Sequence, residues 1–178
     1  MTVRIRLTRP ADAPLFAALL IANREFLAPW DLVREESYYT EAGQRGFIDA
    51  ALERYRSGAA LPYVITIGDR PVGRITLSGI VRGPLQSGNL GYWVSQTENR
   101  RGVATAAVGL MVRTAFADLR LHRVQAETMV HNHASQRVLE RNGFVRYGLA
   151  PAYLKIAGRW QDHVMFQVIN SDGDDTAG

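Results

Sequence analysis

The chain has 178 residues, 47% of them hydrophobic and 21% charged, which is enough for one domain with its own core. It contains no cysteine, so a disulfide framework, a thiolate zinc site and a cysteine nucleophile are excluded. The longest apolar run, APLFAALLIA at residues 13–22, is about half as long as a membrane span. We therefore expect a cytoplasmic protein with no membrane partner and no leader segment.

The charge is moderate, although the sequence pI is 9.8. There are 21 Lys and Arg residues against 17 Asp and Glu, and the arginine-rich balance raises the pI without implying a nucleic-acid partner. The last eight residues, SDGDDTAG at 171–178, hold three aspartates and are expected to be a disordered acidic tail. The rest of the chain then carries +7, which favours an anionic ligand.

The first third of the chain predicts one strand followed by helices. Residues 2–7 alternate like an edge strand, and Pro10 and Asp12 mark the start of a helix with apolar residues at helical spacing. Residues 28–38 have no clean period and are expected to form a loop or a broken helix. The next helix is expected over residues 46–58, closed by its final glycine.

The middle of the chain predicts an antiparallel meander and then a crossover. Residues 61–81 contain two β-rich runs joined by GDRP, and residues 89–96 form a third strand. The longest helical pattern covers residues 103–119, and a strand is expected at 122–130.

The last part predicts a helix and a pair of strands. Residues 132–143 form a helix whose ends are marked by Asn132 and Gly143, and the remaining residues form strands around an AGRW hairpin. This element order is typical of a single α+β domain, here residues 1–170, with a mixed and mostly antiparallel sheet flanked by helices.

One short motif has the features of an anion site. NRRGVAT at residues 99–105 places Gly102 before a run of small residues that begins a helix. A helix N-terminus leaves backbone N–H groups without partners and carries a partial positive charge, so it binds phosphates readily. The motif could also be simply the start of a buried helix, and the two interpretations are compatible.

The order GYWV, NRRGVATAAV and NHASQRVLERNGF resembles the GCN5-related N-acetyltransferase (GNAT) family. Within it, the segments NREFLAPWDLVREES and YLKIAGRWQDHV resemble the RimJ/RimL type, which acetylates the N-terminal alanine of a ribosomal protein. The resemblance implies the GNAT fold, with splayed strands at the acetyl-CoA site. It also implies acetyl-CoA as cosubstrate and the N-terminus of a protein, possibly a ribosomal protein, as acceptor.

The resemblance assigns the acetyl-CoA-binding residues. The family's pyrophosphate loop falls on Asn99, Arg100, Arg101, Gly102, Val103, Ala104 and Thr105. Asn132 and Ser135 fall where the family contacts the pantetheine and the thiol, and Trp93 and Val94 fall on the strand that pairs with the pantetheine. Asn99 replaces the usual Gln or Arg.

The chemistry needs a neutral amine, a donor for the developing oxyanion and a proton for the leaving sulfur. Leu139 occupies the place where many relatives carry a tyrosine that supplies this proton. Glu127 is the candidate base, although it could be a solvated strand carboxylate. Ser135 is the candidate acid, with helix capping as the alternative. Tyr153 is a third candidate, or else a core aromatic.

The acceptor side is expected to include Trp30, Arg34 and Glu35, from the segment that matches the RimJ type. His131 and His133 form an HxH pair, but no carboxylate or thiol cluster completes a metal site, so no metal is expected.

Three functional alternatives stay open at this point. The first is a protein N-terminal acetyltransferase, the second is the same chemistry on a small-molecule amine such as an antibiotic or polyamine, and the third is a non-catalytic CoA- or ribosome-binding module. Either a monomer or a homodimer is expected.

Overall fold

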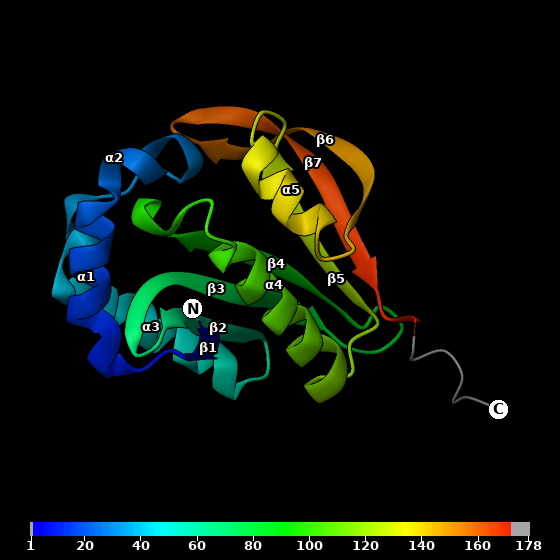
Figure 1. Ribbon diagram of the computed structural model, residues 1–178, viewed down its shortest axis with the longest axis horizontal. Helices are drawn as coiled ribbons and strands as arrows, with labels where there is room; N and C mark the ends of the chain where they lie inside the picture. Colours follow the sequence, from blue (N-terminus) through cyan, green and yellow to red (C-terminus); the bar gives the residue numbers. More distant parts are fainter. Residues whose placement is uncertain (1, 172–178) are drawn as a thin grey trace.

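Seven strands form one sheet in the order β1-β2-β3-β4-β5-β7-β6 in the computed structural model, which describes residues 2–171 (Figure 1). The strands are β1 (Val3–Leu7), β2 (Ala60–Ile67), β3 (Arg70–Val81), β4 (Ser87–Val94), β5 (Arg123–Met129), β6 (Val145–Ile156) and β7 (Arg159–Ile169). The predicted mixed and mostly antiparallel sheet is confirmed, since only β4 and β5 pair in parallel.

Helices connect the strands. They are α1 (Ala13–Ala22), α2 (Arg24–Leu27), α3 (Glu41–Arg56), α4 (Val103–Arg113) and α5 (His133–Glu140). Shorter turns are η1 (Pro10–Asp12), η2 (Ala28–Trp30), η3 (Glu36–Tyr39), η4 (Gln96–Glu98) and the π-turn η5 (Thr114–Asp118). No helix within residues 2–171 is long and apolar enough to cross a membrane.

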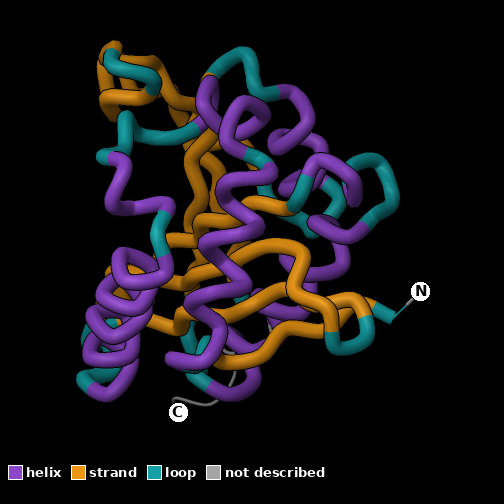
Figure 2. The backbone as a smooth tube through the Cα atoms, turned by 90° about the vertical axis from the view of Figure 1, so that its left-hand side faces the viewer, coloured by secondary structure: helices purple, strands orange, loops and turns teal. Residues whose placement is uncertain are grey.

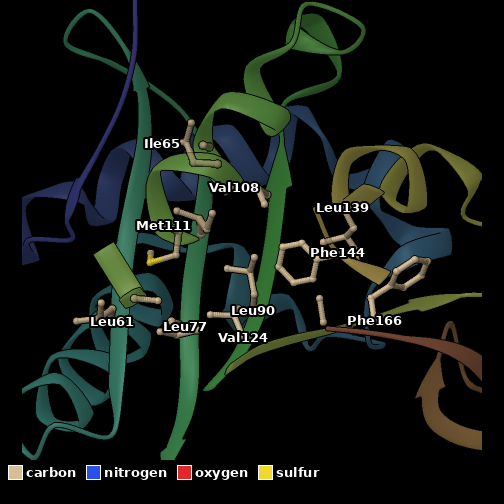
Figure 3. Packing of buried hydrophobic residues seen from close by; sticks show 14 of the residues in the cluster. Leu61, Ile65, Leu77, Leu90, Val108, Met111, Val124, Leu139, Phe144 and Phe166 are labelled. Atoms are coloured by element: carbon tan, nitrogen blue, oxygen red, sulfur yellow. The ribbon is translucent and has the colours of Figure 1, made fainter. Parts of the chain in front are cut away.

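Helices cover both faces of the sheet (Figure 2). The larger core lies beneath α4 and α5, where Val108, Met111 and Leu139 pack on Leu77 and Phe166 (Figure 3). A smaller core lies on the other face, where α1 and α3 pack Phe16, Ile48 and Leu52 against Val64 of β2. Neighbouring residues of β2 and β4 face opposite cores, as the period of two requires: Val64 and Trp93 face the smaller core, and Ile65 and Val94 the larger one.

Two predicted helix boundaries are wrong. α3 begins at Glu41 rather than residue 46, because Thr40 caps it by accepting a hydrogen bond from the Gly43 N–H at 3.1 Å. α4 ends at Arg113 rather than residue 119, because the chain widens there into the π-turn η5.

A loop from the first third of the chain meets the last hairpin beside α2. The turn between β6 and β7 lies against the loop that follows η2, where the Ala157 N–H donates to the Asp31 carbonyl at 3.0 Å (Figure 1). The predicted AGRW hairpin is confirmed by the β6–β7 pairing. Of the predicted acidic tail at 171–178, all but Ser171 lies outside the described residues.

Candidate active site

β4 and β5 separate partway along their length. They pair only where Ser87–Asn89 meets Arg123–Gln125, whereas β4 stays paired with β3 as far as Val94. Within residues 2–171, the β4 edge from Leu90 to Val94 therefore has no strand partner on the β5 side. An extended ligand can add to such an edge through backbone hydrogen bonds.

A cavity of about 380 Å³ lies at this separation. Its walls come from both faces of the sheet: Tyr92 and Leu139 belong to the α4–α5 side, and Arg74 and Trp93 to the α1–α3 side. A ligand in this cavity can thus reach from one face to the other between the separated strands.

Glu127 lies on β5 opposite Met165 of β7 and lines the cavity. Burial raises the pKa of its carboxyl group above the ordinary value. A carboxylate with a raised pKa accepts a proton more readily, so this side chain has the property that a general base needs. It is a half-buried cavity residue rather than a solvated strand carboxylate.

Ser135 lies at the start of α5 and also lines the cavity. The helix is capped by Asn132, whose Oδ1 accepts the Ser135 N–H at 3.1 Å, so the serine hydroxyl is not the cap. The hydroxyl instead lies 2.8 Å from the Tyr92 hydroxyl. Burial raises the pKa of Tyr92 to about 12, which keeps this phenol protonated at neutral pH.

The NRRGVAT motif forms the turn into α4. Gly102 has a φ of 77° and directly precedes Val103, the first residue of the helix. A Cβ added at Gly102 would meet no atom within 4 Å, so the space beside this residue, at the start of α4, is open. Free amides, open space and a helix N-terminus together fit a pyrophosphate.

Glu98 stabilises this turn through its side chain. Its side chain is buried and accepts hydrogen bonds from Arg70 and Arg101, both at 2.7 Å. These two partners hold the pKa of the Glu98 carboxyl below its ordinary value. The side chain of Arg101 is therefore held by Glu98, whereas Arg100 and Asn99 beside it are exposed.

The expected acceptor residues lie in two places. Trp30 and Arg34 line the cavity, where Trp30 stacks on His131 with ring centres 5.5 Å apart and Arg34 pairs with Asp31 at 3.0 Å. Glu35 is exposed, precedes η3 and does not line the cavity.

Tyr153 lies on β6 just outside the cavity lining. Its ring packs edge-on against the cavity residue His163, with centres 5.4 Å apart. Burial and the nearby Glu127 charge raise its pKa, so its hydroxyl stays protonated.

Tyr92, Arg74 and His163 are among the cavity residues that were not predicted from the sequence. Each lies on a strand, and the partners of Tyr92 and Arg74 are distant in the sequence. The segment YLKIAGRWQDHV, which carries part of the family resemblance, contains His163 and was the signal that could have indicated it. In the part of the chain that the structure describes, no group of three or more potential metal ligands occurs.

Comparison with known proteins agrees with this geometry. The Acetyltransferase (GNAT) domain family matches residues 2–145. A probable N-acetyltransferase YjcK of Bacillus subtilis is 36% identical over 97% of both chains. The [ribosomal protein uS5]-alanine N-acetyltransferase of Escherichia coli is 32% identical over 94% of this chain and 88% of its own.

A solved structure has the same fold. Mycobacterium smegmatis RimJ in complex with CoA-disulfide superimposes with a TM-score of 0.92 at 28% identity, covering 96% of this chain and 83% of its own. The sheet order, the separated strands and the family match therefore lead to one conclusion: the chain belongs to the GNAT acetyltransferase family.

Proposed function

We propose that the protein transfers the acetyl group of acetyl-CoA to the N-terminal α-amine of a protein, by direct attack while both substrates are bound. The observation that carries this proposal is the placement of Glu127 and Ser135 in one cavity between the separated ends of β4 and β5. The likeness to uS5-alanine N-acetyltransferase over 94% of the chain supports an α-amine of a ribosomal protein as acceptor.

The residues present fit acetyl-CoA. The amides of Val103, Ala104 and Thr105 would hold the pyrophosphate, with Arg100 adding charge at the rim. The free edge of β4 around Trp93 and Val94 would pair with the pantetheine amides, and Asn132 would lie beside its thiol end. When bound, acetyl-CoA supplies a thioester whose carbonyl carbon is the site of attack.

Glu127 acts as the base in this proposal. An α-amine has a pKa of about 7.7 to 8.0, so roughly a tenth of it is neutral at pH 7, whereas a lysine amine with a pKa near 10.4 is almost entirely charged. A carboxylate with a raised pKa, acting directly or through water, is sufficient to take the proton that the α-amine loses during attack.

Backbone N–H groups on the free edge of β4 stabilise the oxygen that gains negative charge. Ser135 donates its hydroxyl proton to the departing sulfur, and Tyr92, protonated and 2.8 Å away, donates in turn to Ser135 Oγ. The Tyr92 phenolate, which burial disfavours, then regains a proton from solvent, and Glu127 releases to solvent the proton that it took from the amine. Tyr92 thereby takes the role that a tyrosine at position 139 has in many relatives.

The test is a panel of short peptides that begin with Ala, Ser or an N-blocked residue followed by an internal lysine. The free α-amine peptides should release CoA and gain 42 Da, about the mass of one acetyl group, at the N-terminus, while the blocked peptide should not react. Transfer only to lysine or only to small-molecule amines would refute the N-terminal acceptor, and acetyl-CoA binding without any transfer would support a non-catalytic module.

A further inference from the structure

Arg74 is a buried cation on the acceptor side of the cavity. It lies on the inner strand β3, is only 9% exposed, and forms part of the cavity wall. Its guanidinium is held between two rings, 4.2 Å from the centre of Phe16 and 4.4 Å from that of Phe47. This stacking fixes the plane of the group.

No carboxylate among residues 2–171 forms an ion pair with Arg74. One N–H donates to Gln44 Oε1 at 2.8 Å, and Gln44 is itself fixed because its Nε2 donates to the Tyr38 carbonyl at 2.6 Å. A guanidinium has five N–H donors, and the side chain of Tyr38 also engages it, so part of its donor capacity remains available. A buried charge without a counter-ion is costly to the folded protein.

Neither cavity carboxylate forms an ion pair with Arg74. Asp31 pairs directly with Arg34 at 3.0 Å and acts on Arg74 only as a nearby charge. Glu127 lines the same cavity, also without an ion pair to Arg74. The end of the cavity around Arg74 thus contains two guanidinium groups and one aspartate, which is an excess of one positive charge.

We propose that Arg74 binds a carboxylate of the acceptor, and that the protein therefore prefers N-termini with Asp or Glu within the first residues after the acetylated one. The preference rests on the proposed function, because the amine is taken to lie near Glu127 while the acceptor extends along the same cavity toward Arg74. A carboxylate matches the planar fork of a guanidinium and supplies the missing counter-ion. The same chemistry is available from the α-carboxylate of a small amino compound.

The experiment compares isosteric peptide pairs: Asp against Asn and Glu against Gln at the second and third positions after an N-terminal alanine. For the wild-type protein we expect kcat/KM to be at least ~10-fold higher for the acidic member at one of these positions, mostly through KM. In Arg74→Met this preference should disappear: the ratio of kcat/KM between the acidic and the amide peptide, measured within the same variant, should fall to about 1.

A matched control and a stability measurement separate recognition from structure. Arg45→Met alters an exposed arginine of α3 that directly follows Gln44, and it should leave the preference for acidic peptides intact. Arg74→Met should unfold at the same or a higher temperature than wild type, because it replaces an uncompensated buried charge by an apolar chain. A wild type without any acidic preference, or Arg74→Met that keeps it, would overturn the proposal.

The proposed function can fail independently of the proposed carboxylate site. If no peptide is acetylated, calorimetry of the CoA-bound protein still compares the acidic and amide peptides, and amines with and without an α-carboxylate form a second arm. Tighter binding of the carboxylate member that Arg74→Met abolishes would support Arg74 as the carboxylate site, and the arm in which it occurs identifies the source. Equal binding of both members in both arms would refute it.

Discussion

The hydroxyl of Tyr92 lies 2.8 Å from Oγ of Ser135, although the two residues are 43 positions apart on β4 and α5. The same phenol also lies 3.3 Å from the Ser135 carbonyl oxygen. This contact joins the strand along which acetyl-CoA is proposed to bind to the helix that carries the proposed acid.

Tyr92→Phe removes the proton supply to Ser135 without changing the shape of the cavity. We expect kcat to fall by about 10- to 100-fold and the KM for acetyl-CoA to change little, because general acid catalysis contributes roughly 10²- to 10⁴-fold. Ser135→Ala should cost as much or more, and the double variant little beyond it, because the two hydroxyls act in one chain. Steady-state kinetics measures this.

Tyr55→Phe is the control, since Tyr55 lies on α3 and does not line the cavity. Its activity should equal that of the wild type. Full activity of Tyr92→Phe would exclude Tyr92 from the proton path and leave its hydrogen bond as a purely structural contact.

Residues whose role follows from their neighbours in the sequence could be predicted. Residues whose role depends on contacts with distant parts of the chain could not. Asn132 and Ser135 stand in a helix-start pattern, so their place on α5 follows from four consecutive residues. Tyr92 alternates with buried residues and reads as a core aromatic, and only the packing of α5 against β4 reveals its hydroxyl partner. The role of Arg74 could not be predicted for the same reason, because the two rings that hold it, Phe16 and Phe47, come from other elements.

The hairpins β2–β3 and β6–β7 could be predicted, since the two-residue period, the turn GDRP and the AGRW hairpin are local signals. The place of β7 between β5 and β6 could not, because the β5–β7 pairing joins strands that are distant in the sequence. The start of α3 could not, because Gly43 and Gly46 interrupt the helical pattern. Gly43 is present for a tertiary reason: a Cβ there would lie 1.9 Å from the Ser37 carbonyl oxygen.

Glu127→Gln should remove from the pH profile of kcat/KM the rise that belongs to ionisation of Glu127. The raised pKa of Glu127 means that wild-type kcat/KM rises as the pH increases through that pKa and the carboxylate forms. The glutamine variant should be slower by about 10²-fold or more at pH 7, and its remaining rate should follow the amine alone. A profile identical to that of the wild type would argue against Glu127 as the base.

The same substitution should stabilise the fold. A carboxyl group whose pKa is raised in the folded state binds its proton more tightly there, so its contribution to stability decreases as the pH rises from the unfolded pKa through the folded one. Glu127→Gln lacks this loss. Its melting temperature should therefore exceed that of the wild type at pH 8 and approach it at pH 4, as calorimetry at both pH values would show.

Glu98→Gln should loosen the turn before α4. The folded pKa of Glu98 is lowered, so the stability from its pairs with Arg70 and Arg101 is present above the unfolded pKa and is lost as the pH falls through the folded one. We expect a loss of about 1 kcal/mol at pH 7, since both arginines are half-exposed, and a smaller difference in acid. Urea unfolding measures this loss.

Glu53→Gln removes an exposed pair with Arg56 and is the control for Glu98→Gln. It should change the free energy of unfolding by less than about 0.5 kcal/mol. If Glu98→Gln were equally neutral at pH 7, the buried carboxylate would not hold the turn.

Gly102→Ala tests the turn as a phosphate site. An alanine at a φ of 77° is strained by about 1 kcal/mol, which shifts the amides at the start of α4 and should raise the KM for acetyl-CoA several-fold. Gly83→Ala places the same strain at a φ of 69° in the β3–β4 connection, and should lower stability similarly with no change in KM. Equal KM values in the two variants would remove the turn from the proposed acetyl-CoA site.

Two glycines of α3 should respond oppositely to alanine. At Gly46 the added Cβ meets no atom within 4 Å, so Gly46→Ala should stabilise the helix by about 0.5 to 1 kcal/mol. At Gly43 the added Cβ would lie 1.9 Å from the Ser37 carbonyl oxygen, a backbone atom, so Gly43→Ala should destabilise by about 1 to 3 kcal/mol. Displacing η3 from α3 would also disturb the Gln44–Tyr38 contact that fixes Arg74. Urea unfolding separates the two, and a neutral Gly43→Ala would show that η3 can move away from the helix without cost.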